Sequence, residues 1–440
     1  MTAGPISPRS LAGSGRVRAR AAVATTPARL RLAMVLVAVA AVGAALLMAG
    51  AVGSRQRAAN AVATQSGPLL VQADELYASL ADADATAATT FLTGGQEPPA
   101  RRRRYLQDLR SASARLSNLA REVGDSSDAG AAVSQIATLL PVYSGSIEAA
   151  RANNRQGFPI GAAYLREASD VMRGRILPAA GRLYAFEAQK LGDSYKSGTS
   201  WNGIVAFGAG AVLILAVLIA IQVALARRMR RNLNIPMAVA TVLLIGLAAW
   251  GLAAMATEQR ALGDAQRKGS DSVEVLSAAR ILSLRAQADE GLALVARGGG
   301  GQNLAEFDLI MRRLRPDGGL LGEAARLAER AGSAEEGAST ATAFASYRAA
   351  HGRVAALQDQ GRYADAVRLA VAVPGSESAR AARLDATLAA QVAAAQKRFE
   401  RAASRATSAL SGLRIAIILI VAVSALLALA GLQLRMNEYR

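Results

Sequence analysis

Residues 203–256 read GIVAFGAGAVLILAVLIAIQVALARRMRRNLNIPMAVATVLLIGLAAWGLAAMA. Two apolar stretches, Gly203–Ala226 and Ile235–Ala256, stand on either side of the basic segment RRMRRNLN. At 1.5 Å per residue in a helix, each stretch is long enough for the ~30 Å hydrocarbon core of a bilayer. Two further stretches have the same character, Leu32–Gly53 and Leu413–Leu432. The sequence therefore predicts an all-α membrane protein with four transmembrane helices.

The short segments beside these stretches carry most of the net charge of +18. Before the first stretch come six arginines without an acidic residue: Arg9, Arg16, Arg18, Arg20, Arg29 and Arg31. Four more arginines follow the second stretch, and the tail holds Arg435 and Arg440. The two long loops are nearly balanced, each with a net charge of +3. Because basic residues mark the cytoplasmic side, both termini should be cytoplasmic, and the charge does not indicate nucleic-acid binding.

The resulting plan is a multi-pass protein of the plasma membrane. Its segments are a cytoplasmic basic N-terminus (1–31), TM1 (32–53), a first extracytoplasmic bundle (54–202), TM2 (203–226), a cytoplasmic basic loop (227–234), TM3 (235–256), a second extracytoplasmic bundle (257–412), TM4 (413–432) and a cytoplasmic tail (433–440). Ala49-Gly50-Ala51 resembles a signal-peptidase site. The apolar run is longer than the ~7–15 residues usual for a cleaved leader, so we expect a retained anchor.

Composition excludes several kinds of chemistry. The chain has no cysteine and one histidine, His351. Disulfides, thiolate metal sites and His-rich metal sites are therefore excluded, and we expect His351 to be an exposed helix residue. No nucleotide-binding loop, zinc spacing or serine-hydrolase elbow is present. The sequence predicts no catalytic, cofactor or metal site, and spans without a carboxylate do not indicate an ion path.

Sequence echoes at an offset of about 204 residues predict an internal duplication. Gln56-Arg57-Ala58 recurs as Gln259-Arg260-Ala261, directly after the first and third spans. Further along the chain, Tyr143, Gln156 and Gly157 have counterparts in Tyr347, Gln360 and Gly361. The spacing between the three residues is the same in both sets. Two diverged copies of one span–loop–span unit explain the shared offset.

Helical periodicity fills the first long loop. Apolar residues recur at spacings of 4 and 3 at Tyr105, Leu109, Ala112, Leu116, Leu119 and Val123. Similar seams begin at Leu69, Val133 and Leu165, the last with a kink expected at Pro178. Such seams predict an antiparallel four-helix bundle. The second loop has the same pattern, with breaks expected near 298–301, 331–337 and 360–361.

Four consecutive arginines, Arg101, Arg102, Arg103 and Arg104, occur in the segment FLTGGQEPPARRRRYLQDL. They should occupy the first turn of an outer helix at the tip remote from the membrane. One interpretation is a solvated helix start with Glu97 and Asp108 as partners. The other is a contact for an acidic partner or an anionic ligand. On the cytoplasmic side, a readout surface is predicted at Arg227, Arg228, Arg230 and Arg231, with topology and anionic lipid as the alternative.

Two extracytoplasmic bundles combined with only short cytoplasmic segments indicate a sensor that signals through a separate cytoplasmic protein. The whole plan resembles the actinobacterial GlnX-type membrane proteins, and residues 81–109 are similar to the outer bundles of chemoreceptors. The GlnX resemblance implies a relay of Asp/Glu/Gln/Asn-type amino-acid availability. A GlnH-like solute-binding lipoprotein would deliver the signal, and a PknG-like Ser/Thr kinase would receive it. Direct ligand binding, an envelope scaffold or transporter accessory role, and a homodimer stay open.

Overall fold

The computed structural model describes residues 26–94, 97–124, 127–229, 234–371 and 375–437. Within these ranges the secondary structure is helical, without a strand. The chain divides into two compact units. The spanning unit comprises 1–58, 197–260 and 406–440, and the bundle unit comprises 59–196 and 261–405. Within the bundle unit, 59–196 is called the first module and 261–405 the second module.

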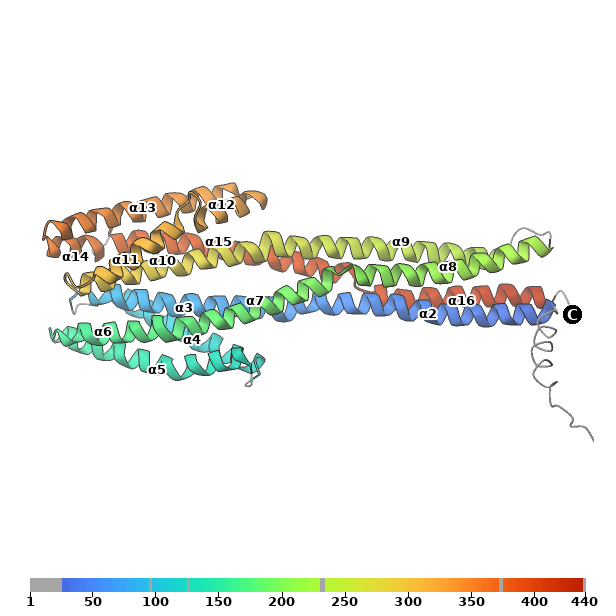
Figure 1. Ribbon diagram of the computed structural model, residues 1–440, viewed down its shortest axis with the longest axis horizontal. Coiled ribbons are helices and arrows are strands. Elements are labelled where there is room, and N and C mark those ends of the chain that lie inside the picture. Colours follow the sequence, from blue (N-terminus) through green and yellow to red (C-terminus); the bar gives the residue numbers. More distant parts are fainter. Residues whose placement is uncertain (1–25, 95–96, 125–126, 230–233, 372–374, 438–440) are drawn as a thin grey trace, which may run out of the picture. The chain divides into compact units, whose positions relative to one another are not determined.

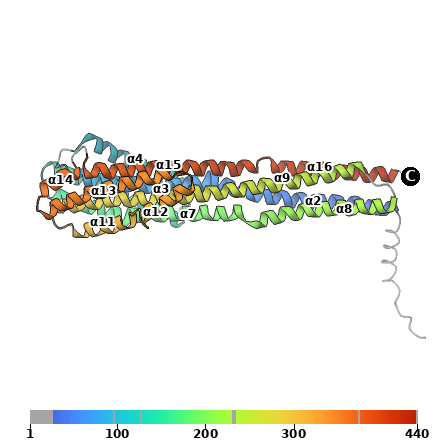
Figure 2. The ribbon, with the colours of Figure 1, turned by 90° about the horizontal axis from the view of Figure 1, so that it is seen from above.

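The spanning unit contains the four predicted transmembrane segments, each inside one helix (Figures 1 and 2). These helices are α2 (Thr26–Asn60), α8 (Trp201–Met229), α9 (Ile235–Asp264) and α16 (Leu413–Asn437). All four are long and apolar enough to cross a membrane. They share one core, which contains small residues such as Ala44 together with Phe207, Leu244 and Ile417. Large apolar side chains such as Leu46 and Val212 remain exposed on the outer faces, as expected for contact with lipid.

Two polar side chains of the spanning unit, those of Gln222 and Asn234, form hydrogen bonds between helices. Gln222 of α8 donates from Nε2 to the carbonyl of Met237 at 3.0 Å and to Thr241 Oγ1 at 2.9 Å, both on α9. Asn234 donates from Nδ2 to the carbonyl of Gly431 at 2.9 Å. These hydrogen bonds fix the register of neighbouring helices. They also avoid the free-energy cost of burying a polar group without a hydrogen-bond partner.

The first module is the predicted four-helix bundle. After a short π-helical segment, η1 (Ala61–Ser66), its helices are α3 (Gly67–Phe91), α4 (Pro99–Glu122), α5 (Asp128–Arg155) and a fourth built from α6 (Ile160–Val171), η2 (Met172–Ile176) and α7 (Leu177–Thr199). The predicted seam residues Tyr105, Ala112 and Leu119 are buried. The π-helical η2 lies one turn before Pro178, where proline withholds the N–H that an α-helix needs.

The second module has the expected breaks and two more. Its elements are η3 (Ala265–Ser270), α10 (Asp271–Val295), α11 (Gly301–Leu314), α12 (Leu320–Arg330), α13 (Ala334–Asp359), α14 (Tyr363–Val371) and α15 (Glu377–Ala409). Between α11 and α12, Pro316 cannot continue the helix and Gly318 adopts a positive φ of 78°. A further break separates α14 from α15. The second and fourth helices of this module are therefore each split in two.

The duplication is visible in the paired elements. Both α3 and α10 have 25 residues, and both follow a π-helical segment of 6 residues. Helices α5 and α13 both end at a glutamine cap followed by a glycine of positive φ, 75° at Gly157 and 71° at Gly361.

Equivalent residues of the two copies also touch each other. In the bundle unit, Ser277 Oγ donates to Asp74 Oδ2 at 2.7 Å across a separation of 203 residues. At the same separation, a Cβ on Gly291 would lie 3.1 Å from Ala88 Cβ. In the spanning unit, Arg55 Nη2 lies 2.6 Å from Glu258 Oε2, again 203 residues away. Contacts at one constant separation mean that α3 and α10 run parallel, related by a pseudo-two-fold axis.

Candidate functional site

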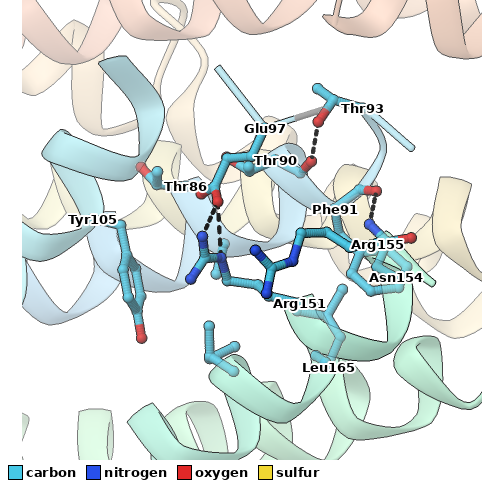
Figure 3. A pocket seen from close by; sticks show the side chains of 13 residues that line it. Thr86, Thr90, Phe91, Thr93, Glu97, Tyr105, Arg151, Asn154, Arg155 and Leu165 are labelled. Carbon is cyan, nitrogen blue, oxygen red and sulfur yellow. Dashed lines mark hydrogen bonds and ion pairs between the residues drawn. The ribbon is translucent and has the colours of Figure 1, made fainter. Parts of the chain in front are cut away.

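A pocket lies inside the first module, between the ends of α3 and α5 and the start of α4 (Figure 3). Its cavity is small, about 30 Å³ in volume. Its lining is Thr86, Ala87, Thr90, Phe91, Thr93, Glu97, Tyr105, Ile147, Ala150, Arg151, Asn154, Arg155 and Leu165. Apolar side chains and the charged side chains of Glu97, Arg151 and Arg155 share this lining.

Charged groups in the pocket are partly paired. Arg151 donates from Nε to Glu97 Oε2 at 2.9 Å and from Nη1 to Glu148 Oε2 at 2.6 Å. Arg155 lies one helical turn further along α5, beside Arg151 in Figure 3. It is exposed, and among the residues that the structure describes none pairs with its guanidinium. A small anion entering the pocket would therefore meet an unoccupied guanidinium.

Two hydroxyl groups in the pocket are buried without a hydrogen-bond partner in the described part of the chain, Thr90 Oγ1 and Tyr105 Oη. Burial raises the pKa of Tyr105, so its hydroxyl stays protonated and can donate. An unmade hydrogen bond of a buried hydroxyl costs roughly 1–3 kcal/mol, which a bound ligand can recover. The pocket thus brings a guanidinium, a carboxylate and two hydroxyls together with apolar side chains, and these groups complement those of a free amino acid.

Buried ion pairs join the two modules. Arg173 of the first module donates from Nε to its own Asp84 at 3.2 Å and also pairs with Asp289 of the second module. Ser169 Oγ donates to Asp84 Oδ1 at 2.7 Å, and Asn303 Nδ2 donates to Asp289 at 3.3 Å. Both carboxylates are nearly inaccessible. Arg173 therefore holds two buried negative charges from different modules.

Arg104 makes a second bridge between the modules. Its Nη2 lies 2.9 Å from both Asp82 of the first module and Asp385 of the second. Arg280 also pairs with Asp385, at 2.7 Å. Burial, with a smaller contribution from the neighbouring Asp82 carboxylate, raises the pKa of Asp108 to about 8. Asp108 is therefore largely protonated at neutral pH, which relieves the crowding of carboxylates around Arg104.

The arginine run is engaged mainly inside the molecule. Arg101 donates from Nη2 to the carbonyl of Val371 at 3.2 Å and to Ser378 Oγ at 3.1 Å, both in the second module. Arg102 pairs with Glu148 at 2.7 Å, and Arg103 is exposed. Glu97, expected beside the run, pairs instead with Arg151. The structure gives Arg101 and Arg104 a role between modules, and leaves a contact with an outside partner as a prediction for which Arg103 is the accessible residue.

The predicted cytoplasmic readout falls at the end of α8. Arg227 is exposed on its last turn, and Arg228 belongs to the same helix. Arg230 and Arg231 lie outside the described residues. The readout surface stays a prediction.

His351 is not the exposed helix residue that its isolation in the sequence predicted. Its side chain is 16% exposed and is held between Glu290 and Glu377, with the ring of Phe307 stacked on it at 3.9 Å. The expectation was wrong because Glu377 begins α15 only after an unforeseen break, which places this carboxylate against α13.

The pocket itself was missed from sequence. Thr86 and Thr90 are polar residues within the run ADADATAATT, where α3 is buried on almost every side. Hydroxyls and carboxylates concentrated on one fully buried helix were the available signal, because buried polar groups need partners or ligands.

Residues 58–196, which contain the pocket, match a protein family described as an actinobacterial sensor domain. No curated protein and no solved structure matches the chain. The family match supports a sensing or signalling role and an actinobacterial origin. The chain also has four helices that are long and apolar enough to cross a membrane, which is consistent with a membrane protein.

Proposed function

We propose that this protein is a non-catalytic transmembrane sensor of amino-acid availability, with both modules outside the cell and both termini in the cytoplasm. The observation that carries the proposal is the first-module pocket, which combines the free guanidinium of Arg155 with unpartnered hydroxyls. A free amino acid presents a carboxylate for Arg155, an ammonium group for Glu97 and a side chain for the apolar wall. Asp, Glu, Asn and Gln are the ligand class.

Binding in the pocket can reach the rest of the molecule through α3. This helix lines the pocket with Thr86 and Thr90, and contacts the second module at Ala88. The helical stretch Arg29–Phe91 that contains α3 also contains the first candidate span. A shift of α3 against α10 on binding is therefore a physical route for a signal toward the spans.

The resemblance of the whole plan to GlnX-type proteins supports two further parts of the proposal. A solute-binding lipoprotein would present the amino acid or its signal to the outer modules, with Arg103 as an accessible contact. A cytoplasmic Ser/Thr kinase would receive the signal at the basic segment that contains Arg227 and Arg228.

Calorimetric titration of the full-length protein in nanodiscs tests the proposal. Asp, Glu, Asn and Gln are added singly, with and without a candidate lipoprotein. We expect one of them to bind and to raise stability by ~2.7 kcal/mol at 100 times its Kd. The variant Arg155→Gln should weaken direct binding roughly 10- to 100-fold, the value of one charge-assisted hydrogen bond.

Arg110→Gln is the matched control, because Arg110 is an exposed arginine of α4 that does not line the pocket. Binding that needs the lipoprotein, and is lost in Arg103→Glu but kept in Arg155→Gln, would favour the relayed route over direct binding. A protein that responds to none of these amino acids under either condition would be a scaffold, and the proposal would be wrong.

A further inference from the structure

A cluster of one histidine and two glutamates lies inside the second module. His351 Nδ1 is 2.6 Å from Glu290 Oε1 and 3.2 Å from Glu377 Oε1. The three residues come from α13, α10 and α15, so the cluster joins three helices that are separate in the sequence. One ligand atom from each residue lies within 4.8 Å of the others, which is close enough for a single cation.

The negative charge of the cluster lacks a fixed counterion. Glu290 and Glu377 are buried, at 6% and 1% exposure. Within the described residues, no ion pair joins either carboxylate to a lysine or arginine. With both glutamates ionised, the cluster carries a charge of −2 when His351 is neutral and −1 when it is protonated. Burying an unpaired charge is costly, whereas a divalent cation neutralises two carboxylates completely.

An unsatisfied atom points to the same conclusion. Glu377 Oε2 is buried and has no hydrogen-bond partner in the described part of the chain. The N-terminus of α15 supplies only about half a positive charge to the Glu377 carboxylate. By contrast, the buried carboxylates of Asp82, Asp84, Asp289 and Asp385 each pair with an arginine.

The surroundings resemble those of metal ligands. Tyr347 donates its hydroxyl to Glu290 Oε2 at 3.3 Å, which orients the carboxylate, and Phe307 covers the imidazole face. Secondary contacts of this kind hold ligands in place around protein-bound metals. Ligand atoms around a tetrahedral zinc ion lie roughly 3.3 Å apart, so the observed distances need only small adjustments.

We propose that the second module binds one divalent transition-metal cation, of the Zn²⁺ or Mn²⁺ type, through Glu290, His351 and Glu377. Imidazole nitrogen with two carboxylates is a donor set for these ions. The cation ties α10, α13 and α15 together and stabilises the second module, in a site separate from the first-module pocket.

The test uses full-length protein in detergent, purified on a tag without histidine and stripped with a chelator. Zn²⁺ or Mn²⁺ alone is then titrated by calorimetry. We expect one equivalent per chain and a rise in the unfolding temperature. Glu377→Gln and His351→Asn should each weaken binding at least roughly 100-fold, as expected for the loss of one of three ligands. Glu335→Gln, an exposed glutamate of α13, is the matched control and should bind as the wild type does.

X-ray absorption at the zinc edge provides a test that needs no variant. Because the chain holds one histidine and no cysteine, imidazole scattering from a bound ion identifies His351 as its ligand. The proposal is overturned if the stripped protein binds neither ion at millimolar concentration, if Glu377→Gln binds as tightly as the control, or if the spectrum lacks imidazole.

Discussion

The two modules use the same place in the bundle for different chemistry. At the offset of about 204 residues that relates Tyr143 to Tyr347, Ile147 of the first module corresponds to His351 of the second. Around His351, helices α10 and α15 supply the carboxylates of Glu290 and Glu377. Near Ile147, which lines the first-module pocket, helix α3 supplies the hydroxyl groups of Thr86 and Thr90 instead.

The difference shows how a duplicated bundle can divide its roles. In a symmetric dimer of identical chains, both copies would carry the same pocket and the same interface residues. Covalent duplication frees each copy to change alone. Arg55 faces Glu258, and Asp74 faces Ser277, at positions where identical chains would place two arginines or two aspartates together. The two copies thus place different and complementary residues at equivalent positions.

Of the changes considered below, removal of Arg173 should weaken the contact between the two modules most. Arg173→Ala leaves Asp84 and Asp289 as buried carboxylates without their cation, so we expect a loss of ~3 kcal/mol in the free energy of unfolding. Chemical denaturation of the full-length protein, followed by circular dichroism, measures the effect. Arg175→Ala, an exposed neighbour, is the control and should change stability by less than ~0.5 kcal/mol. Equal stability of the two variants would show that the modules do not depend on this bridge.

A smaller effect should follow from pH. The pKa of Asp108 is about 8 in the folded protein, above the ordinary aspartate value of 3.8. The folded state therefore binds more protons than the unfolded state between these values, and this contribution to stability is lost as pH rises toward 8. We expect the wild type to lose stability between pH 5 and pH 8 through this group, because the folded state keeps a proton that the unfolded state has already released.

Unfolding temperatures measured across this pH range compare the wild type with Asp108→Asn. The variant cannot ionise at this position, so its stability should fall less steeply with pH. Other buried carboxylates remain in both proteins and contribute to the residual slope, among them Asp74, whose pKa burial raises to about 6. If the unfolding temperatures of the two proteins fell equally with pH, Asp108 would not be the cause of the pH dependence.

The fold could be predicted from the sequence more fully than the site. Apolar length located the spans, and the heptad seam through Tyr105 and Leu119 predicted a bundle, because both signals are local. The echo of Gln156-Gly157 in Gln360-Gly361 revealed the duplication for the same reason. The pocket and the His351 cluster depend on side chains from three or four helices, including a break before Glu377. No local pattern encodes how such helices meet, so these residues could be found only in the folded structure.

Hydrogen–deuterium exchange of the full-length protein, with and without a saturating amino acid of the proposed class, tests the central claim most directly. The claim is that the ligand binds in the first module and not at the equivalent place in the second. We predict slower exchange in residues 86–93 and 147–155, which line the pocket, and unchanged exchange in residues 347–360. Protection confined to 347–360, or absent from both segments while the ligand is bound, would contradict it.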